Sequence, residues 1–243
     1  MCAQPIVIPV VGLIGGVGSG KSSVAQRCQA MRPVAIIDAD QLGHQVLHLP
    51  TVKERIRQRF GPTIFQSVPQ PSGSEQLQPT APFPDGRGTD QEISRSALGR
   101  LVFGLDSAAQ QARHDLEAIV HPEIRSLLER EIRELRRQAN VEAIVLDAAV
   151  LLEAGWNDLC DVVVFIDTPE ADRIARVRAG RGWSAAELAK REANQWPLLR
   201  KRAAADAVID NSNSVDDAAE RLIEIMTKFQ NPMSKEIPMT KSQ

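Results

Sequence analysis

The stretch VVGLIGGVGSGKSS, residues 10–23, decides the fold predicted for this chain. Its spacing G-x-x-x-x-G-K-[ST] is supplied by Gly15, Gly20, Lys21 and Ser22. Glycines at these positions let consecutive backbone N–H groups point into one concavity, where they and the positive end of the following helix hold an anion. Phosphate is the anion that fits such a loop.

We predict that the loop binds a nucleoside triphosphate. Lys21 would reach the β- and γ-phosphates, and the Ser22 hydroxyl would contact a Mg²⁺ ion that bridges the same two groups. Such a site would bind ATP or GTP, and the sequence lacks the tetrapeptide N-K-x-D that a GTP-dependent switch protein would also carry. The predicted ATP-binding residues are Gly15, Gly16, Val17, Gly18, Ser19, Gly20, Lys21, Ser22 and Ser23.

The context of the loop predicts a parallel α/β sheet. An apolar run precedes the loop, and apolar residues at helical spacing follow it. Near-continuous apolar runs separated by helical segments indicate a parallel sheet with helices on both faces, here the five-stranded sheet of a P-loop NTPase. The other four predicted strands end at Asp38, Asp147, Asp167 and Asp210. Ligands of such sheets gather at these carboxyl ends, but we interpret Asp167 and Asp210 as turn or cap residues.

We interpret the chain as a single domain, residues 1–243, with several parts. The predicted parts are a nucleotide-binding core at 6–60, 141–168 and 203–228, a flexible Pro-rich loop at 66–91, a helical substrate-binding lobe at 92–139, a two-helix lid at 169–202, and a polar tail at 229–243.

Local signals place helix boundaries in the lobe and the lid. His121-Pro122 is predicted to interrupt the second helix of the lobe, because proline fixes a helix start. Thr168 is predicted to cap the helix after it, and Ser184 with Glu187 forms a capping box for the next helix. The arginines of these two helices and the strand context favour a lid over phosphates rather than a pair of solvated helical faces.

Composition bounds the compartment and the partners. The 243 residues carry a formal net charge of −2, which gives no sequence-wide reason to expect a nucleic acid or an acidic membrane as a partner. Three widely spaced cysteines without a C-x-x-C pair suggest neither a disulfide framework nor a zinc site. No apolar run approaches the roughly 18 residues of a membrane-spanning helix. We therefore expect a cytoplasmic protein with a small-molecule substrate, and infer no obligatory protein partner.

Motifs along most of the chain resemble those of the dephospho-CoA kinase family, and they occur in that family's order. They are GLIGGVGSGKS at 12–22, DAD at 38–40, SRSALGRLVF at 94–103, LEAIVHPEI at 116–124, DAAVLLEAG at 147–155 and ADAVIDN at 205–211. The resemblance implies transfer of the γ-phosphate of ATP, with Mg²⁺, to the ribose 3′-hydroxyl of dephospho-CoA. This is the last step of coenzyme A synthesis.

The resemblance also implies roles for individual residues. Asp40 is the predicted general base that accepts the proton of the ribose hydroxyl. Asp38 would position that hydroxyl or contact Mg²⁺ through water, and the choice between these two carboxylates stays open. The predicted cations for the group in transfer are Lys21, Arg176 and Arg181. The predicted acceptor-side residues are Arg95, His121, Asp147 and Glu153.

Some residues depart from the family pattern, and two other functions stay open. Ile14 stands where Thr is usual, Ala149 where Pro is usual, and Arg173 where Gln is frequent. Another nucleoside, nucleotide or small-molecule kinase would share the loop, the lid and the acidic base, so only the acceptor-side motifs separate it from this family. An ATP-dependent switch that binds a partner is the alternative from a different class.

Overall fold

The computed structural model describes residues 8–67, 91–104 and 106–230. The chain divides into two compact units, one made of residues 1–42 and 125–243 and the other of residues 43–124. Helices α2 (Ala39–Val46) and α5 (Ser107–Leu135) each contain residues of both units. The unit of residues 1–42 and 125–243 is called the sheet unit, and that of residues 43–124 the helical unit.

The sheet unit is built on the parallel five-stranded sheet that the sequence predicts. Its strand order is β2-β5-β1-β6-β7, so the strand before the phosphate loop is central. All neighbours in it are parallel, with Leu13 of β1 opposite both Asp147 of β5 and Val164 of β6. The strands are β1 (Val10–Gly15), β2 (Val34–Asp38), β5 (Ala143–Asp147), β6 (Val162–Asp167) and β7 (Ala207–Asp210). The predicted fold class is therefore confirmed.

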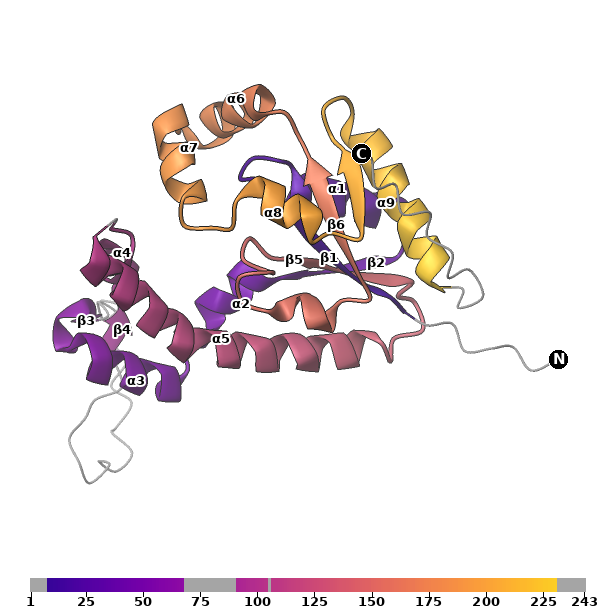
Figure 1. The fold of residues 1–243 in the computed structure, drawn as a ribbon. Helices are drawn as coiled ribbons and strands as arrows, with labels where there is room; N and C mark the ends of the chain where they lie inside the picture. The colour runs from indigo at the N-terminus through magenta and orange to yellow at the C-terminus, as the bar shows by residue number, and fades with distance from the viewer. Residues whose placement is uncertain (1–7, 68–90, 105, 231–243) are drawn as a thin grey trace, which may run out of the picture. The chain divides into compact units, whose positions relative to one another are not determined.

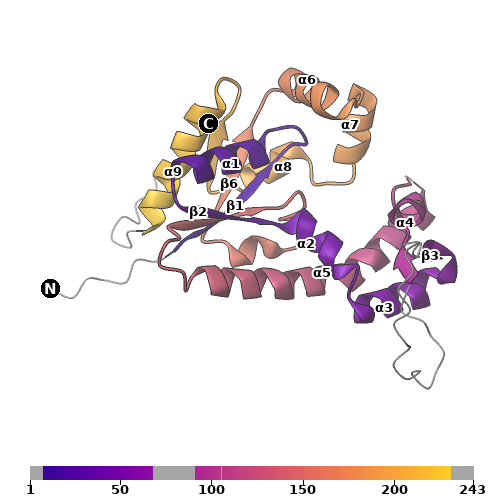
Figure 2. The ribbon, with the colours of Figure 1, turned by 180° about the vertical axis from the view of Figure 1, so that it is seen from behind.

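Helices cover both faces of this sheet (Figures 1 and 2). On one face, α1 (Lys21–Met31) and α9 (Val215–Gln230) pack together over β1 and β6, and the predicted apolar residues of α1 are buried there. The second half of α5 and the short helix η2 (Trp156–Leu159) lie on the opposite face. Both faces of the strands are thus buried, which explains their near-continuous apolar sequences.

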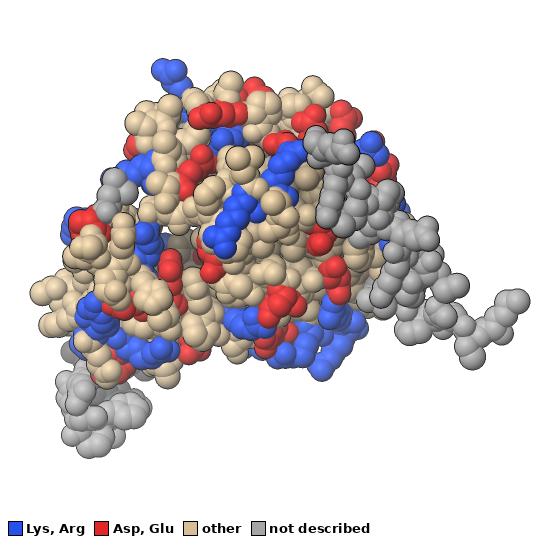
Figure 3. Space-filling view, in the orientation of Figure 1, with Lys and Arg blue, Asp and Glu red and all other residues tan. Residues whose placement is uncertain are grey.

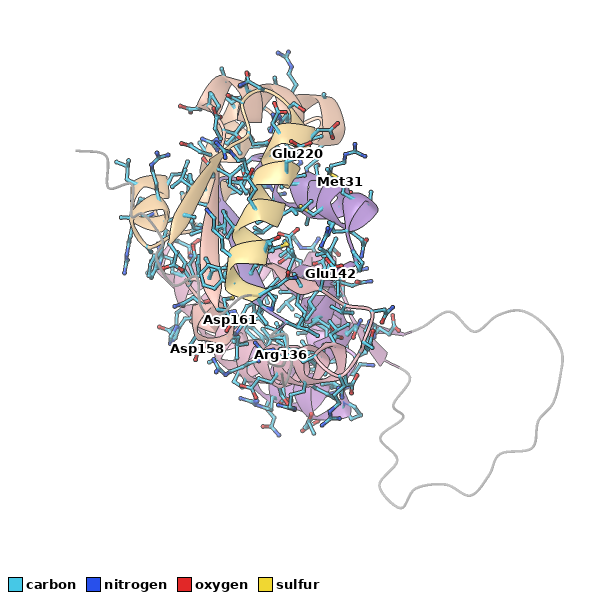
Figure 4. All side chains as sticks on the ribbon, turned by 90° about the vertical axis from the view of Figure 1, so that its right-hand side faces the viewer. Met31, Arg136, Glu142, Asp158, Asp161 and Glu220 are labelled. Atoms are coloured by element: carbon cyan, nitrogen blue, oxygen red, sulfur yellow. The ribbon has the colours of Figure 1, made fainter. Side chains whose placement is uncertain are left out.

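An ion pair fixes the end of the sheet away from the phosphate loop. The Asp161 carboxylate accepts hydrogen bonds from the Val10 backbone N–H at 2.7 Å and from Arg136 Nη2 at 2.9 Å. Figure 4 shows Arg136 and Asp161 at this end of the sheet unit. These contacts join the turn that follows α5 to the start of β1, so the sheet is anchored where no chemistry is predicted.

The lid segment forms three helices: α6 (Glu170–Arg181), α7 (Ala185–Glu192) and α8 (Leu198–Ala203). The capping box predicted for Ser184 and Glu187 is confirmed at α7. The cap predicted for Thr168 is wrong, because α6 begins after Pro169 without a side-chain cap. The Thr168 hydroxyl instead donates to the Ser19 carbonyl, 2.9 Å away in the phosphate loop.

The helical unit has its own small core. Its elements are α3 (Pro50–Phe60), η1 (Pro62–Ile64), β3 (Phe65–Ser67), β4 (Gln91–Ile93), α4 (Arg95–Val102) and the first half of α5. Buried apolar residues from these elements pack together. The structure differs from the loop predicted at 66–91 at both of its ends, because the residues there belong to β3 and β4, which pair antiparallel. Residues 68–90 of that predicted loop lie outside the described residues.

The predicted interruption at His121-Pro122 is wrong, since α5 runs through Pro122. Proline in a helix removes a donor to the carbonyl four residues before it, here that of Ala118. Arg55 of α3 supplies a substitute, with Nη2 3.3 Å from the Ala118 carbonyl oxygen and Nη1 3.4 Å from that of Ile119. A long-range guanidinium contact thus lets the helix continue.

The end of the described chain lies in α9. The polar tail predicted at 229–243 starts within this helix, and residues 231–243 lie outside the described residues. Among the helices in the described ranges, none combines the length and the apolar character needed to span a membrane.

Candidate active site

The phosphate loop leaves β1 and closes at the first residue of α1, as predicted. Gly20 has φ of +87°, a left-handed conformation that side chains other than glycine rarely adopt. A Cβ atom at Gly20 would also lie 2.6 Å from the Asn211 Nδ2 atom. Glycine is required at this position for both reasons.

Three side chains fix the loop by donating to one carbonyl oxygen. The Ser19 carbonyl accepts from Asn211 Nδ2 at 2.8 Å, from Thr168 Oγ1 at 2.9 Å and from Arg176 Nη1 at 3.3 Å. Arg176 also donates from Nη2 to the Asn211 carbonyl, 2.8 Å away. The predicted lid arginine Arg176 therefore joins the loop to the residues that follow β6 and β7.

Lys21 folds back over the loop, and other charged groups act on it. Its Nζ atom lies 3.3 Å from the Gly15 carbonyl oxygen and 3.2 Å from that of Gly16. Desolvation lowers the pKa of the Lys21 ammonium, and the Asp147 carboxylate opposes this shift. The other charged groups that shift this pKa are Lys201, Asp40 and Arg181. The charges of three predicted site residues, Asp147, Asp40 and Arg181, therefore act on the Lys21 ammonium.

Ser22 and Asp147 form the pair that could hold a divalent cation. The Ser22 Oγ atom donates to Asp147 Oδ2 at 2.5 Å. Asp147 ends β5, beside the loop, and a hydroxyl with a carboxylate in this place is the donor set that P-loop enzymes use for Mg²⁺. The side chains present fit the predicted ion.

The Asp38 and Asp40 carboxylates differ in their local contacts. Asp38 ends β2, and its Oδ1 atom accepts from the Gln41 backbone N–H at 3.0 Å, which caps the start of α2. Asp40 lies in the first turn of α2, and its side chain is exposed. One carboxylate oxygen of Asp38 is therefore already engaged in capping α2.

Arg181 lies at the far end of α6, next to a left-handed Gly182. Its guanidinium stacks on the Trp183 ring at 4.7 Å from the centroid, and Arg191 of α7 stacks on the same ring at 3.8 Å. Trp183 thus holds two cations at the junction of two lid helices, an arrangement worth about 0.5–1 kcal/mol per contact at exposed sites.

Glu153 is engaged by a buried lysine that sequence reasoning did not single out. Lys201 of α8 is 1% exposed, and its Nζ atom lies 3.0 Å from Glu153 Oε1. It also donates to Gln195 Oε1 at 2.9 Å and to the Ala149 carbonyl at 3.1 Å. This ammonium therefore joins the end of the lid to the loop after β5, which contains Ala149.

Arg173, noted above as a departure from the family pattern, is buried against the phosphate loop. Its guanidinium donates to Glu192 Oε1 of α7 and, at 3.4 Å, to the Val17 carbonyl. The same Glu192 oxygen accepts from the Val17 backbone N–H at 3.1 Å. A Cβ atom at Gly16 would lie 2.7 Å from Arg173 Nη1, so the guanidinium needs glycine there.

A pocket of about 300 Å³ adjoins this part of the loop. It is lined by Gly16, Phe165, Ile166, Asp167, Thr168, Arg173, Leu198, Leu199 and Arg202. Asp167 forms an ion pair with Arg202 of α8, and α6, which follows it, has no side-chain cap. Asp210 accepts from the Ser212 backbone N–H at 2.9 Å, as expected of the turn residue predicted there. Basic side chains gather over α8 on the face seen in Figure 3.

The remaining predicted residues, Arg95 and His121, belong to the helical unit. Arg95 is the first residue of α4, after the capping Ser94. His121 lies within α5, and partial burial lowers its imidazole pKa, with Glu117 opposing the shift. Their roles toward an acceptor stay predictions.

Sequence reasoning missed Thr168, Lys201 and Glu192 as contacts of the site. Thr168 directly follows a predicted strand, which was a usable signal, because the carboxyl ends of strands carry ligand contacts. Lys201 lies in a basic run that is typical of an exposed helix, and nothing local distinguishes it. Glu192 likewise resembles any helical surface charge.

Comparisons with known proteins identify the family of the chain. A family model described as Dephospho-CoA kinase matches residues 9–74 and 72–217. A protein of Geobacter sulfurreducens named dephospho-CoA kinase is 36% identical over 220 residues, covering 90% of this chain and 98% of the relative. One of Rhodopirellula baltica with the same name is 32% identical over 216 residues, covering 89% and 88%.

Solved structures show the same fold. The crystal structure of TT1252 from Thermus thermophilus has a TM-score of 0.67 at 27% identity, covering 91% of this chain and 98% of the other. A dephospho-CoA kinase from Campylobacter jejuni has a TM-score of 0.57 at 20% identity, covering 90% and 97%, which bears on the fold alone. Because the family model spans most of the chain, the chain belongs to the dephospho-CoA kinase family.

Proposed function

We propose that the protein transfers the γ-phosphoryl group of ATP to the ribose 3′-hydroxyl of dephospho-CoA, giving coenzyme A, in the cytoplasm. The observation that most supports the proposal is the hydrogen bond between Ser22 and Asp147 at the end of a complete phosphate loop, where the charges of Asp40 and Arg181 also act on the Lys21 ammonium. Family membership supplies the identity of the acceptor.

The loop would hold the donor. Backbone N–H groups at the start of α1 would bind the β-phosphate, and the Lys21 ammonium would exchange the Gly15 and Gly16 carbonyls for phosphate oxygens. A loop already fixed through the Ser19 carbonyl loses little entropy on binding. Ser22 and Asp147 would hold Mg²⁺, which when bound neutralises charge on the β- and γ-phosphates.

Asp40 would act as the base and Asp38 as a positioning residue. A ribose hydroxyl is a weak nucleophile, so a carboxylate has to accept its proton as it attacks. The capping contact of Asp38 with Gln41 supports this division, because it already occupies one oxygen of that carboxylate. Asp147, which the motifs assign to the acceptor, is better supported beside the metal ion by its contact with Ser22.

The lid would supply positive charge. The charge of Arg181 acts on Lys21, and this arginine would neutralise charge on the phosphoryl group during its transfer. Arg176 would contribute mainly by holding the loop. Arg95 and His121 are proposed to contact the acceptor, and Glu153 to fix the end of the lid through Lys201.

ADP release in Mg-ATP tests the proposal, with dephospho-CoA, adenosine and shikimate compared as acceptors and with Lys21→Ala as the inactive control. We expect turnover of dephospho-CoA and little of the others, with the product identified by mass and by its 3′-phosphate. Turnover of a nucleoside and none of dephospho-CoA would instead support the alternative of another small-molecule kinase.

A further inference from the structure

The Glu192 carboxylate occupies a place on the phosphate loop that has the chemistry of a phosphate site. One of its oxygens, Oε1, accepts from the Val17 backbone N–H at 3.1 Å and from the Arg173 guanidinium. A bound phosphate oxygen would accept hydrogen bonds from the same two kinds of donor, a loop N–H and a guanidinium. The carboxylate belongs to α7, 175 residues along the chain from Val17.

Arg173 is built into the loop rather than lying on its surface. Its side chain is 5% exposed, and its Nε atom has no hydrogen-bond partner among the described residues. The α6 backbone also approaches the loop, since a Cβ atom at Gly18 would lie 2.9 Å from the Arg173 carbonyl oxygen. A buried guanidinium with an unused donor has capacity for another anion.

The position of Arg173 identifies the phosphate it would meet. Its Nη1 atom lies against Gly16, the same residue whose carbonyl oxygen is 3.2 Å from Lys21 Nζ. Lysine in this motif reaches the β- and γ-phosphates. Arg173 therefore lies against the part of the loop that Lys21 also contacts, where the β- and γ-phosphates would be held, and it lines the adjoining pocket.

We propose that Arg173 is a further ligand of the γ-phosphate, and that the Glu192 carboxylate occupies the position of this phosphate before ATP binds. When ATP binds, a γ-phosphate oxygen replaces Glu192 Oε1 on Arg173 and Val17, and α7 loses its contact with the loop. The carboxylate thus competes with the triphosphate, while it prevents a buried guanidinium from lying unpaired in the empty enzyme. The inference rests on the proposed function for ATP binding and is independent of the acceptor.

Equilibrium binding without an acceptor tests the inference, with Mg-ADP and the non-hydrolysable Mg-AMPPNP titrated by calorimetry. Glu192→Gln removes the competing charge, so AMPPNP should bind about three- to tenfold more tightly and ADP within about twofold of the wild type. Arg173→Gln should weaken the binding of AMPPNP by about tenfold and leave the affinity for ADP nearly unchanged. Glu220→Gln, an equal charge change on the exposed outer side of α9 (Figure 4), should change neither affinity.

The ratio of the two affinities decides the outcome. If Glu192→Gln leaves the AMPPNP-to-ADP ratio at its wild-type value, the pair only supports the fold, and the inference is overturned. Should Arg173→Gln fail to fold because the site is buried, the better exposed Glu192 variant, with its melting temperature recorded, still decides. A wild-type protein that binds neither nucleotide would overturn the proposed function as well, whereas turnover of another acceptor would leave this inference standing.

Discussion

The two halves of the candidate site in the sheet unit are held in different ways. The donor half lies at the end of central strand β1, where the Ser19 carbonyl accepts three side-chain donors. The carboxylates proposed to face the acceptor are exposed, with Asp38 at the end of edge strand β2 and Asp40 in the first turn of α2. The difference is one of preorganisation, since the protein itself fixes the donor groups and leaves room around the base for a substrate.

This contrast separates the effects of substitutions. A change in the donor half removes contacts that exist without substrate, so it should lower the free energy of unfolding. A change at Asp40 removes the carboxylate that would accept the proton of the reacting hydroxyl, so its main effect should be on the rate.

Asp40→Asn should lower kcat for dephospho-CoA by about 10²- to 10⁴-fold, the range that general-base catalysis supplies. ATP affinity should stay nearly unchanged, and the loss of unfolding free energy should stay below about 1 kcal/mol, because asparagine keeps the size and one accepting oxygen of the exposed aspartate while the first turn of α2 loses a charge. Steady-state kinetics and a denaturant titration measure the two effects. Near-normal turnover would move the base to Asp38.

Lys201→Met should destabilise the protein by about 3–5 kcal/mol, because it leaves Glu153 partly buried without its cation. Guanidinium titration measures the loss. In the double variant Lys201→Met with Glu153→Gln, the residual charge is gone while the amide oxygen can still accept from the Trp196 N–H. Most of the stability should return, and an equal loss in both variants would show that packing, not charge, dominates.

Gly20→Ala should cost more than Gly155→Ala, although both glycines have left-handed φ values, of +87° and +71°. Any side chain pays about 1–2 kcal/mol for that conformation. Only at Gly20 would the new Cβ meet other atoms, 2.6 Å from Asn211 Nδ2, which adds about 1–3 kcal/mol of overlap. Thermal unfolding of both variants checks the difference. Equal losses of stability would mean that the phosphate loop shifts to accommodate the methyl group.

The sequence predicted the strands and the phosphate loop because both depend on local patterns. Apolar runs bury both faces of a sheet wherever the helices lie, and the loop motif specifies its own backbone conformation. The interruption at Pro122 was predicted wrongly because the compensating donor, Arg55, lies 63 residues before Ala118, whose carbonyl it contacts. Lys201 and Glu192 were missed for the same reason, since their partners are set by packing and not by neighbours in the chain.

Asp38→Ala should give the smallest effect on stability and separates capping from catalysis. Loss of the contact with the Gln41 N–H should destabilise α2 by about 1 kcal/mol. Asp38→Asn keeps an oxygen that can accept from that N–H, so it should retain the stability while removing the charge. If Asp38 only positions the hydroxyl, the Asn variant should lose far less turnover than Asp40→Asn in the same assay. A loss as large as that of Asp40→Asn, at full stability, would show that both carboxylates act on the proton and that the edge strand carries two catalytic groups.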